Sequence, residues 1–360
     1  MSAIGECFFL DVGQGTSQVI VLPDRSAIII DCGPSFEVLG DLLKRRLGVT
    51  RIKLLIISHN HHDHIGCLPD LLRNFRNSID EIRILQDQPA KSLMDQEAFT
   101  ALVQESKNRN CPEPRPLYRE RTDGVLYQSN LMRLEVLFPS FWENLQSQES
   151  SDANQSCAVL VLHCGERRIL FSGDAKISVW NSIYERRGLK AIECDVAAIP
   201  HHGGEVIRPR KSAETVDEHH INIKSDLARL YGKIIHCKVG IVSVGTDFQY
   251  KHPIPPHIEA VRDGGACVMC TQITERCSAD LESLRPGVLD SDGHPRKSKS
   301  AAAKTSTGRS KDVACAGTIL VEISPVEIKV LRHAEHQTAI DAKLLKPLCR
   351  IPLSPTPTGR

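Results

Sequence analysis

The sequence has few aromatic residues and almost no net charge. Phe, Trp and Tyr make up 4% of its 360 residues, and 45 Lys plus Arg stand against 44 Asp plus Glu. Without an excess of either sign, no global field directs the chain to nucleic acid or to a membrane surface. The scarcity of aromatic side chains also leaves few stacking platforms for single strands. Any site for a polyanion is therefore expected to be local.

Long hydrophobic runs are missing as well. No stretch approaches the ~20 apolar residues that span a membrane, and the first ten residues, MSAIGECFFL, lack the basic n-region of an export signal. The 13 cysteines stand at irregular spacings, which is unlike a small secreted disulfide framework and favours reduced thiols. We therefore expect no membrane segment and a cytoplasmic location.

Short apolar runs separated by turn signals predict an α/β protein. Several predicted strands end in polar turns, which favours two mixed sheets between helices with a site on loops at one sheet edge. The predicted strands are 7–10, 18–22, 27–31, 54–58, 81–85, 131–138, 158–164, 168–172, 196–199, 239–244, 316–323 and 327–331. The predicted helices are 36–46, 93–107, 177–187, 225–231 and 256–262.

Side chains that bind metals are concentrated after the strand at 54–58, in the run SHNHHDHIG. A core could not solvate so many polar groups cheaply, so packing alone does not explain His59, His61, Asp63 and His64. Imidazole and carboxylate are the usual ligands of zinc and related ions. The His-x-His pair can bind one ion while Asp63 and His64 bind its neighbour, and two adjacent ions activate water for hydrolysis. His62 is expected to face away.

This run resembles the His-x-His-x-Asp-His signature of the metallo-β-lactamase superfamily, and further motifs follow in the same order. The resemblance is closest to the branch that includes the β-lactamase-like domain of ComEC-type DNA-uptake proteins. Its motifs match DVGQG (11–15), IIDCG (29–33), NQS (154–156), LFSGD (170–174), PHHG (200–203) and SVGTDFQYKHP (243–253). The resemblance covers roughly residues 6–274 and implies a four-layered αββα sandwich of two mixed sheets flanked by helices.

The resemblance also implies roles for single residues. Asp174 matches the aspartate that bridges both ions, although by spacing alone it also fits the cap of the helix predicted to begin at 177. His201 or His202 matches the histidine of the second ion; we assign His201 to the metal and His202 to catalysis, but the sequence does not order them. Asp31 and Asp11 match buried aspartates that support the ligand loop.

One departure from the family bears on metal identity. Many members supply a third histidine to the first ion from the segment before the Ser-Gly-Asp strand, where this chain has Asn154 and Ser156. We take Asn154 as a ligand and Ser156 as its support. Oxygen ligands are harder than imidazole, so this site is expected to bind zinc less tightly and to tolerate manganese. The expected cofactor is a pair of divalent ions, Zn or Mn.

Further residues are candidates for contact with substrate. His252 matches the branch and is expected to act as general acid or to bind phosphate, with a plain turn histidine as the alternative. Arg208, Arg210 and Lys211 would line the site if their loop folds over it, and three cations suit a phosphodiester. An ordinary solvated loop is equally consistent with that segment.

Composition predicts how the chain is divided. Residues 1–284 are expected to form the catalytic domain, and residues 314–350 to complete it with the last strands. Between them, 285–313 is predicted to be a mobile basic loop, and 351–360 a disordered tail. Four cysteines near this junction form a loosely spaced set that could bind a structural zinc ion: Cys267, Cys270, Cys277 and Cys315. Against this, Cys267 and Cys270 lie on a likely strand, where residues three apart point to opposite faces.

The sequence therefore predicts a metal-dependent phosphodiesterase, with DNA as the leading substrate. Asp63, Asp174, His202 and His252 are the expected catalytic residues. One alternative is a small-molecule hydrolase acting on a phosphodiester, a phosphocholine ester or a lactone, because one fold serves many substrates. Another is a partner-binding module that keeps the metals for structure alone.

Overall fold

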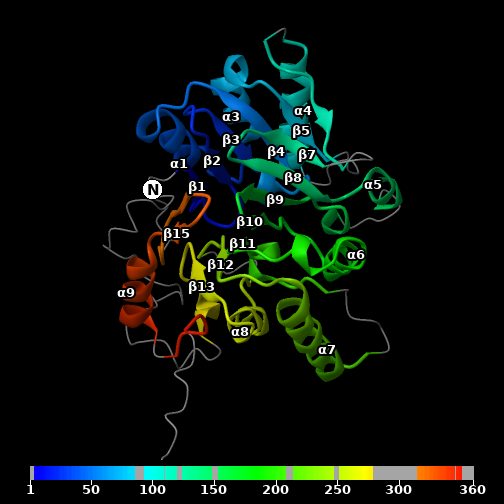
Figure 1. Ribbon diagram of the computed structural model, residues 1–360, viewed down its shortest axis with the longest axis vertical. Coiled ribbons are helices and arrows are strands. Elements are labelled where there is room, and N and C mark those ends of the chain that lie inside the picture. Colours follow the sequence, from blue (N-terminus) through cyan, green and yellow to red (C-terminus); the bar gives the residue numbers. More distant parts are fainter. Residues whose placement is uncertain are drawn as a thin grey trace, which may run out of the picture.

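The structure is a computed structural model, and it describes residues 4–85, 93–108, 110–119, 124–147, 153–207, 214–246, 251–278, 314–344 and 346–350. Its elements form four layers, with two sheets packed face to face and helices on the outer face of each (Figure 1). The predicted αββα class is confirmed.

The first sheet contains the N-terminal strands and the last two strands of the chain. Its members are β1 (Gly5–Phe9), β2 (Gln18–Val21), β3 (Ala27–Ile30), β4 (Ile52–Ile57), β5 (Ile82–Ile84), β6 (Arg115–Pro116), β14 (Ile319–Ile323) and β15 (Ile328–Val330). Their order across the sheet is β15-β14-β1-β2-β3-β4-β5-β6. Neighbours from β3 to β6 are parallel and the other neighbours are antiparallel. Of the C-terminal strands, β14 thus pairs with β1, and β15 pairs with β14 at the edge of the sheet.

The second sheet repeats this mixed pattern. Its members are β7 (Val125–Gln128), β8 (Arg133–Phe138), β9 (Val159–Cys164), β10 (Arg167–Phe171), β11 (Val196–Ala198), β12 (Val239–Val242) and β13 (Cys267–Cys270). They lie in the order β13-β12-β11-β10-β9-β8-β7, antiparallel from β7 to β10 and parallel from β10 to β13. In sheets of this kind, ligands bind beyond the carboxyl ends of the parallel strands. Here the polar motifs follow the ends of β4, β10, β11 and β12.

Three apolar clusters hold the layers together. One fills the space between the sheets, where the rings of Phe9 and Phe171 stack with centroids 6.0 Å apart. The outer clusters lie under the helices of each face. The helices and turns are α1 (Phe36–Asp41), η1 (Leu42–Arg46), α2 (His62–Ile65), α3 (Leu68–Phe75), η2 (Arg76–Ser78), α4 (Leu93–Ser106), α5 (Phe141–Ser147), η3 (Ala153–Gln155), α6 (Ile177–Arg187), η4 (Leu189–Ala191), η5 (Pro200–Gly203), α7 (Val216–Arg229), η6 (Leu230–Ile234), α8 (Pro255–Asp263), η8 (Glu275–Cys277) and α9 (His333–Lys343).

One predicted helix was too short. The pattern gave 225–231, whereas α7 begins at Val216 and η6 continues it to Ile234. Thr215 caps the helix: its side chain accepts from the amide of Glu218, and the Glu218 carboxylate accepts from the Thr215 amide. This capping box, Thr-x-x-Glu, is a start signal that the sequence already contained. Helices α2, α3, α5 and α9 and strands β6 and β7 were not predicted.

Two predicted segments, 285–313 and 351–360, lie outside the described residues. Within the described part of the chain, no helix is long and apolar enough to cross a membrane.

Candidate metal centre

The first part of the centre is the loop that follows β4. His59 and His64 are fully buried, and His61 and Asp63 are half-buried. Asp31, at the end of β3, holds this loop through three contacts of 2.7 Å. Its carboxylate accepts from the Ser58 amide and from the Ser58 hydroxyl, and Oδ2 also contacts His64 Nδ1. The loop is thereby fixed on the adjacent parallel strand.

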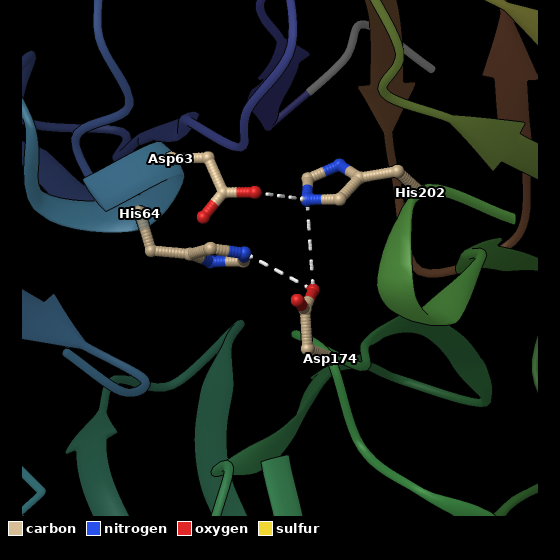
Figure 2. A group of neighbouring side chains, drawn as sticks. All are labelled: Asp63, His64, Asp174 and His202. Carbon is tan, nitrogen blue, oxygen red and sulfur yellow. Dashed lines mark hydrogen bonds and ion pairs between the residues drawn. The ribbon is translucent and has the colours of Figure 1, made fainter. Parts of the chain in front are cut away.

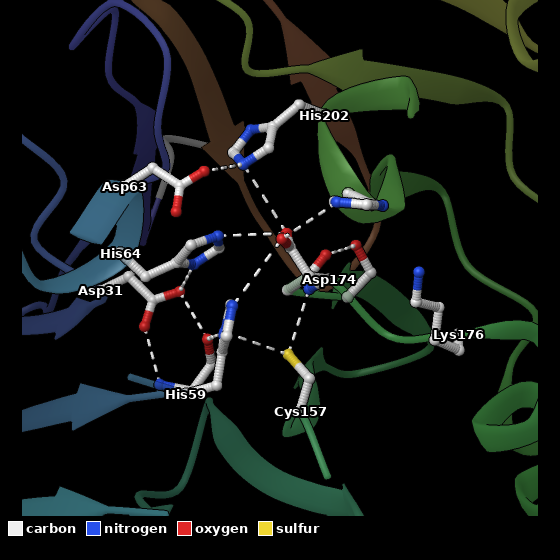
Figure 3. A network of polar contacts seen from close by, with 12 residues as sticks. Asp31, His59, Asp63, His64, Cys157, Asp174, Lys176 and His202 are labelled. Atoms are coloured by element: carbon white, nitrogen blue, oxygen red, sulfur yellow. Dashed lines mark hydrogen bonds and ion pairs between the residues drawn. The ribbon is translucent and has the colours of Figure 1, made fainter. Parts of the chain in front are cut away.

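Asp174 follows β10 and lies at the middle of the centre (Figure 3). Gly173 before it has a φ of +47°, and a Cβ there would lie 2.4 Å from Cys157 Sγ, so only glycine fits this turn. The Asp174 amide donates to Cys157 Sγ at 3.1 Å. The position of the carboxylate is therefore set by β9 and β10 together.

The third part is η5, which follows β11. His201 and His202 both adopt a left-handed backbone with φ 53°, which is uncommon for residues other than glycine. The turn continues with Gly203 at φ +73°, where a Cβ would lie 2.7 Å from the Cβ of Pro253. The His201 amide donates to the carbonyl of Gly173 at 3.0 Å. This contact joins the two loops of the second sheet.

These loops bring together two groups of ligand atoms that share Asp174, each group lying within 4.8 Å. One consists of Asp63, His64, Asp174 and His202 (Figure 2). The other consists of His59, His61 and Asp174. Oδ1 of Asp174 is 3.0 Å from His64 Nε2 and 3.6 Å from His202 Nε2. Oδ2 is 3.7 Å from Nε2 of both His59 and His201. His62 belongs to neither group.

In three of the histidines, a hydrogen bond at Nδ1 orients the ring so that Nε2 points at the centre. His201 Nδ1 donates to the carbonyl of Glu205 at 2.8 Å, and His202 Nδ1 donates to the carbonyl of Ser243 at 2.7 Å. Ser58 gives its proton to Asp31, so His59 Nδ1 can donate to the Ser58 oxygen at 3.1 Å. A hydrogen-bonded Nδ1 leaves the lone pair on Nε2, which is the arrangement of metal-binding histidines.

The buried charges of the centre shift one another's pKa values. Burial alone would raise the pKa of Asp174, but the surrounding histidines, His64 first, outweigh it and hold the pKa well below its usual range. Burial would also lower the pKa of His64, yet Asp174 and Asp31 raise it well above the usual value. For His59, burial and the charge of His64 lower the pKa far below its usual range. The buried carboxylates of Asp31 and Asp174 therefore require positive charge beside them, because an isolated buried charge is costly.

The residues present fit divalent cations. Imidazole nitrogens and carboxylate oxygens form a donor set typical of zinc and of similar ions. His59 Nε2 is buried and has no hydrogen-bond partner among the described residues. A cation between the rings and Asp174 would satisfy that nitrogen and supply the missing charge.

Other predicted site residues lie around this centre. The His252 ring centroid is 5.0 Å from that of His201 and 6.0 Å from that of His202. Asn154 and Ser156 are buried, and the Asn154 carbonyl accepts from the Lys176 amide at 3.4 Å. The Asp11 carboxylate accepts from Nε2 of the Gln272 side chain at 2.6 Å, and the Asp11 backbone amide donates to the Thr318 hydroxyl. Three predicted substrate residues fall outside the described part of the chain: Arg208, Arg210 and Lys211.

The sequence interpretation missed two supporting residues. Cys157 was not singled out in the sequence, but its sulfur lies 3.4 Å from His59 Nδ1 and accepts from the Asp174 backbone amide. Gln14 joins two distant loops, because its Nε2 donates to His252 Nδ1 at 3.4 Å and its Oε1 accepts from the Gly245 amide. The only signal for either was its position, Gln14 within DVGQG and Cys157 directly after NQS. Of the described residues, no group close enough to hold an ion contains a cysteine, so the proposed zinc set at 267–315 is not formed.

Comparisons with known proteins agree with this architecture. The family model of the metallo-beta-lactamase superfamily matches residues 10–131. The chain is 35% identical over 71 residues to the lactamase-like protein ptaB of Pestalotiopsis fici, a match that covers 19% of this chain and 23% of that protein. The chain therefore spans about a quarter of the length of this curated relative.

Solved structures give similarities at low identity. A variant of CmlA beta-hydroxylase is 12% identical with a TM-score of 0.42, over 75% of this chain and 53% of that one. The metallo hydrolase Igni18 of the archaeon Ignicoccus hospitalis is 14% identical with a TM-score of 0.39, over 74% of this chain and 94% of that one. The match over residues 10–131 and the arrangement of the two sheets agree with the metallo-β-lactamase fold, and the described residues include a candidate His/Asp metal site.

Proposed function

We propose that this protein is a metal-dependent phosphodiesterase and that its leading substrate is DNA. The observation that carries the proposal is the pair of ligand groups that share Asp174. Two divalent ions held side by side would supply an activated water and would stabilise the charge on phosphoryl oxygens. Zn and Mn are the candidate ions.

The ligand groups suggest which residues would hold each ion. His59, His61 and Asp174 would hold the first, with Asn154 and His201 as the remaining candidates. Asp63, His64, Asp174 and His202 would hold the second. This assignment gives His202 the ligand role that the sequence interpretation assigned to His201, because Nε2 of His202 lies 3.1 Å from Asp63 Oδ2.

Four side chains are candidates for the chemistry itself. Asp63 and Asp174 would orient the attacking water through their carboxylates. His202 would contribute to catalysis as a ligand of the second ion. His252 would act as a hydrogen-bond donor rather than a general acid, because burial, with the charges of His202 and His201, lowers its pKa to about 3. The Gln14 amide donates to Nδ1, so the neutral ring carries its proton on Nε2, where it could stabilise a leaving oxygen.

The assignment to nucleic acid rests on residues of the sequence. Arg208, Arg210 and Lys211 follow η5 in the chain, and cationic side chains there suit a phosphate backbone. The likeness of DVGQG and SVGTDFQYKHP to ComEC-type domains favours the same substrate class. Thirteen free cysteines suit a reducing compartment such as the cytoplasm.

The test is a panel of substrates. Purified protein, depleted of metal and reloaded with Mn²⁺ or Zn²⁺, is offered plasmid, single-stranded DNA, RNA and bis-p-nitrophenyl phosphate. We expect metal-dependent cleavage of DNA, and its loss in a variant that combines His61→Ala with Asp63→Ala. A matched control combines His236→Ala with Asp217→Ala, which changes the same residue types at exposed positions.

Each other outcome contradicts part of the proposal. Turnover of the small ester alone would indicate a small-molecule hydrolase, and would overturn the nuclease assignment. A protein that binds both ions tightly but turns over no substrate would be a metal-stabilised binding module. Cleavage that survives in the double variant would come from a contaminant.

A further inference from the structure

Tyr231 and His257 form a buried pair next to the turn that carries His201 and His202. Tyr231 lies in η6 and His257 in the first turn of α8, and both side chains are almost completely inaccessible to solvent. The phenol oxygen lies 2.6 Å from His257 Nε2. On the other side of the ring, Nδ1 lies 2.7 Å from the carbonyl oxygen of Gly204. The pair therefore connects two outer helices to the residue that follows η5.

The chemistry of the three groups fixes the direction of both hydrogen bonds. A carbonyl oxygen only accepts, so His257 Nδ1 must carry the proton and donate to Gly204. Burial lowers the pKa of His257 to about 4, so the ring is neutral near pH 7 and Nε2 is an acceptor. Tyr231 must then donate its hydroxyl proton to Nε2. The tyrosine thus selects the tautomer that holds Gly204.

Gly204 lies at the end of the strained turn. Its amide donates to the carbonyl of His201 at 2.6 Å, and the next carbonyl, that of Glu205, accepts from His201 Nδ1. A left-handed backbone at two consecutive histidines costs free energy, and such a conformation persists only where the surroundings determine it. The Gly204 peptide is one of the groups that determine it.

We propose that Tyr231 and His257 are positioning residues for the segment His201–Glu205. The tyrosine hydroxyl fixes the tautomer of His257, and His257 fixes the Gly204 carbonyl. The segment then keeps the conformation in which Nε2 of His201 and His202 point at Asp174. This inference rests on the proposed metal-dependent function, but it concerns residues that belong to neither ligand group.

The test is Tyr231→Phe, which removes one hydroxyl and keeps the ring. Tyr184→Phe is the matched control, since Tyr184 lies exposed on α6. Affinity for Mn²⁺ and Zn²⁺ is measured by titration of metal-depleted protein against a competing chelator. Loss of a residue that orients metal ligands from outside typically weakens metal binding 10–100-fold. We expect a loss of roughly tenfold or more in Tyr231→Phe and no change in Tyr184→Phe.

Two further measurements separate positioning from packing. Ring ¹⁵N shifts should report the altered hydrogen bond at His257, and hydrogen exchange of the Gly204 amide should accelerate in Tyr231→Phe. In a second pair of variants, His257→Asn keeps an N–H near the place of Nδ1 and should retain more metal affinity than His257→Leu. Lower thermal stability with unchanged metal affinity and unchanged exchange at Gly204 would overturn the proposal.

Failure of the proposed function would look different. If the wild-type protein binds metal but hydrolyses no phosphodiester, the positioning role still stands on affinity and exchange. If it binds no metal, the proposed function fails, and the exchange of the Gly204 amide alone decides whether Tyr231 holds the segment.

Discussion

At the scale of single residues, Asp174 connects everything in the centre. Its two oxygens face different histidines, and it belongs to both ligand groups. Asp174→Asn keeps the shape of the side chain and removes the charge that both ions would need. We predict that it weakens binding of both ions by at least about 100-fold, because loss of an outer support alone costs 10–100-fold. Metal analysis after gel filtration measures this.

A carboxylate elsewhere provides the control for Asp174. Asp195 accepts from Arg167 and Lys238 near the surface, and Asp195→Asn should leave the metal content unchanged. Loss of only one ion in Asp174→Asn would contradict the shared role of Asp174.

Asp31 makes the second prediction at this scale. It holds both Ser58 and His64, so Asp31→Asn should lower metal affinity by roughly 10–100-fold, although Asp31 itself contacts no ligand Nε2. Asp31 has a left-handed backbone with φ 59°, a conformation that asparagine tolerates well. Backbone strain would therefore not explain the loss. An unchanged affinity in the chelator titration would show that the support is dispensable.

The sequence predicted some of these residues and could not predict others. His59, His61, Asp63 and His64 lie within six residues of one strand, so their convergence follows from local geometry. Which of His201 and His202 lies in the ligand group depends on two left-handed backbone conformations, and histidine as a residue type does not predict them. The contact between Gln14 and His252 joins residues 238 positions apart, and only the folded sheets bring them together.

At the scale of elements, the interior strands were the easiest to predict. β3 and β4 are buried on both faces, so their sequences are almost continuous runs of Ile and Leu. Helix α7 was harder because its first half, VDEHHIN, carries few apolar residues, and its start is marked by the Thr215 cap instead. The short strand β6 (Arg115–Pro116) has exposed residues and pairs only at the sheet edge. Tertiary context alone makes it a strand.

The link between β8 and α6 gives a prediction about pH. Glu135 is buried on β8, and Arg187, the last residue of α6, contacts its carboxylate at 2.5 Å. Burial would raise the pKa of Glu135, but contacts with His163 and Arg187 outweigh it and lower the pKa from 4.5 to about 2. The folded state thus binds this proton less readily than the unfolded chain. The stabilisation is complete above pH 4.5 and is lost as the pH falls toward 2.

We therefore predict that Glu135→Gln lowers the free energy of unfolding by on the order of 2 kcal/mol at pH 7 and by less at pH 3. Urea denaturation in the presence of EDTA measures both values, because the chelator keeps bound metal from adding its own pH dependence. Glu185→Gln, at an exposed position of α6, serves as the control. A destabilisation that is the same at both pH values would assign the effect to packing.

At the scale of the whole molecule, the candidate centre joins the two sheets. The first sheet supplies His59, His61, Asp63 and His64 from the end of β4. The second supplies Asp174 after β10 and His202 after β11. Neither sheet holds a complete group, because every ligand group includes Asp174 from the second sheet and histidines from the first. Bound ions would therefore link the two sheets in addition to activating water for hydrolysis.

This arrangement predicts a large effect of metal on stability. Ions that bind only the folded state stabilise it by about 2.7 kcal/mol when their concentration is 100 times the Kd. For 360 residues, an unfolding entropy of about 2.1 cal/mol/K per residue converts this stabilisation into a rise in Tm of roughly 4 °C for each ion. Thermal unfolding with Mn²⁺ or Zn²⁺ against EDTA measures the shift, and Asp174→Asn should abolish it while Asp195→Asn keeps it. A shift that persists in Asp174→Asn would place the stabilising ion at a site that does not join the sheets.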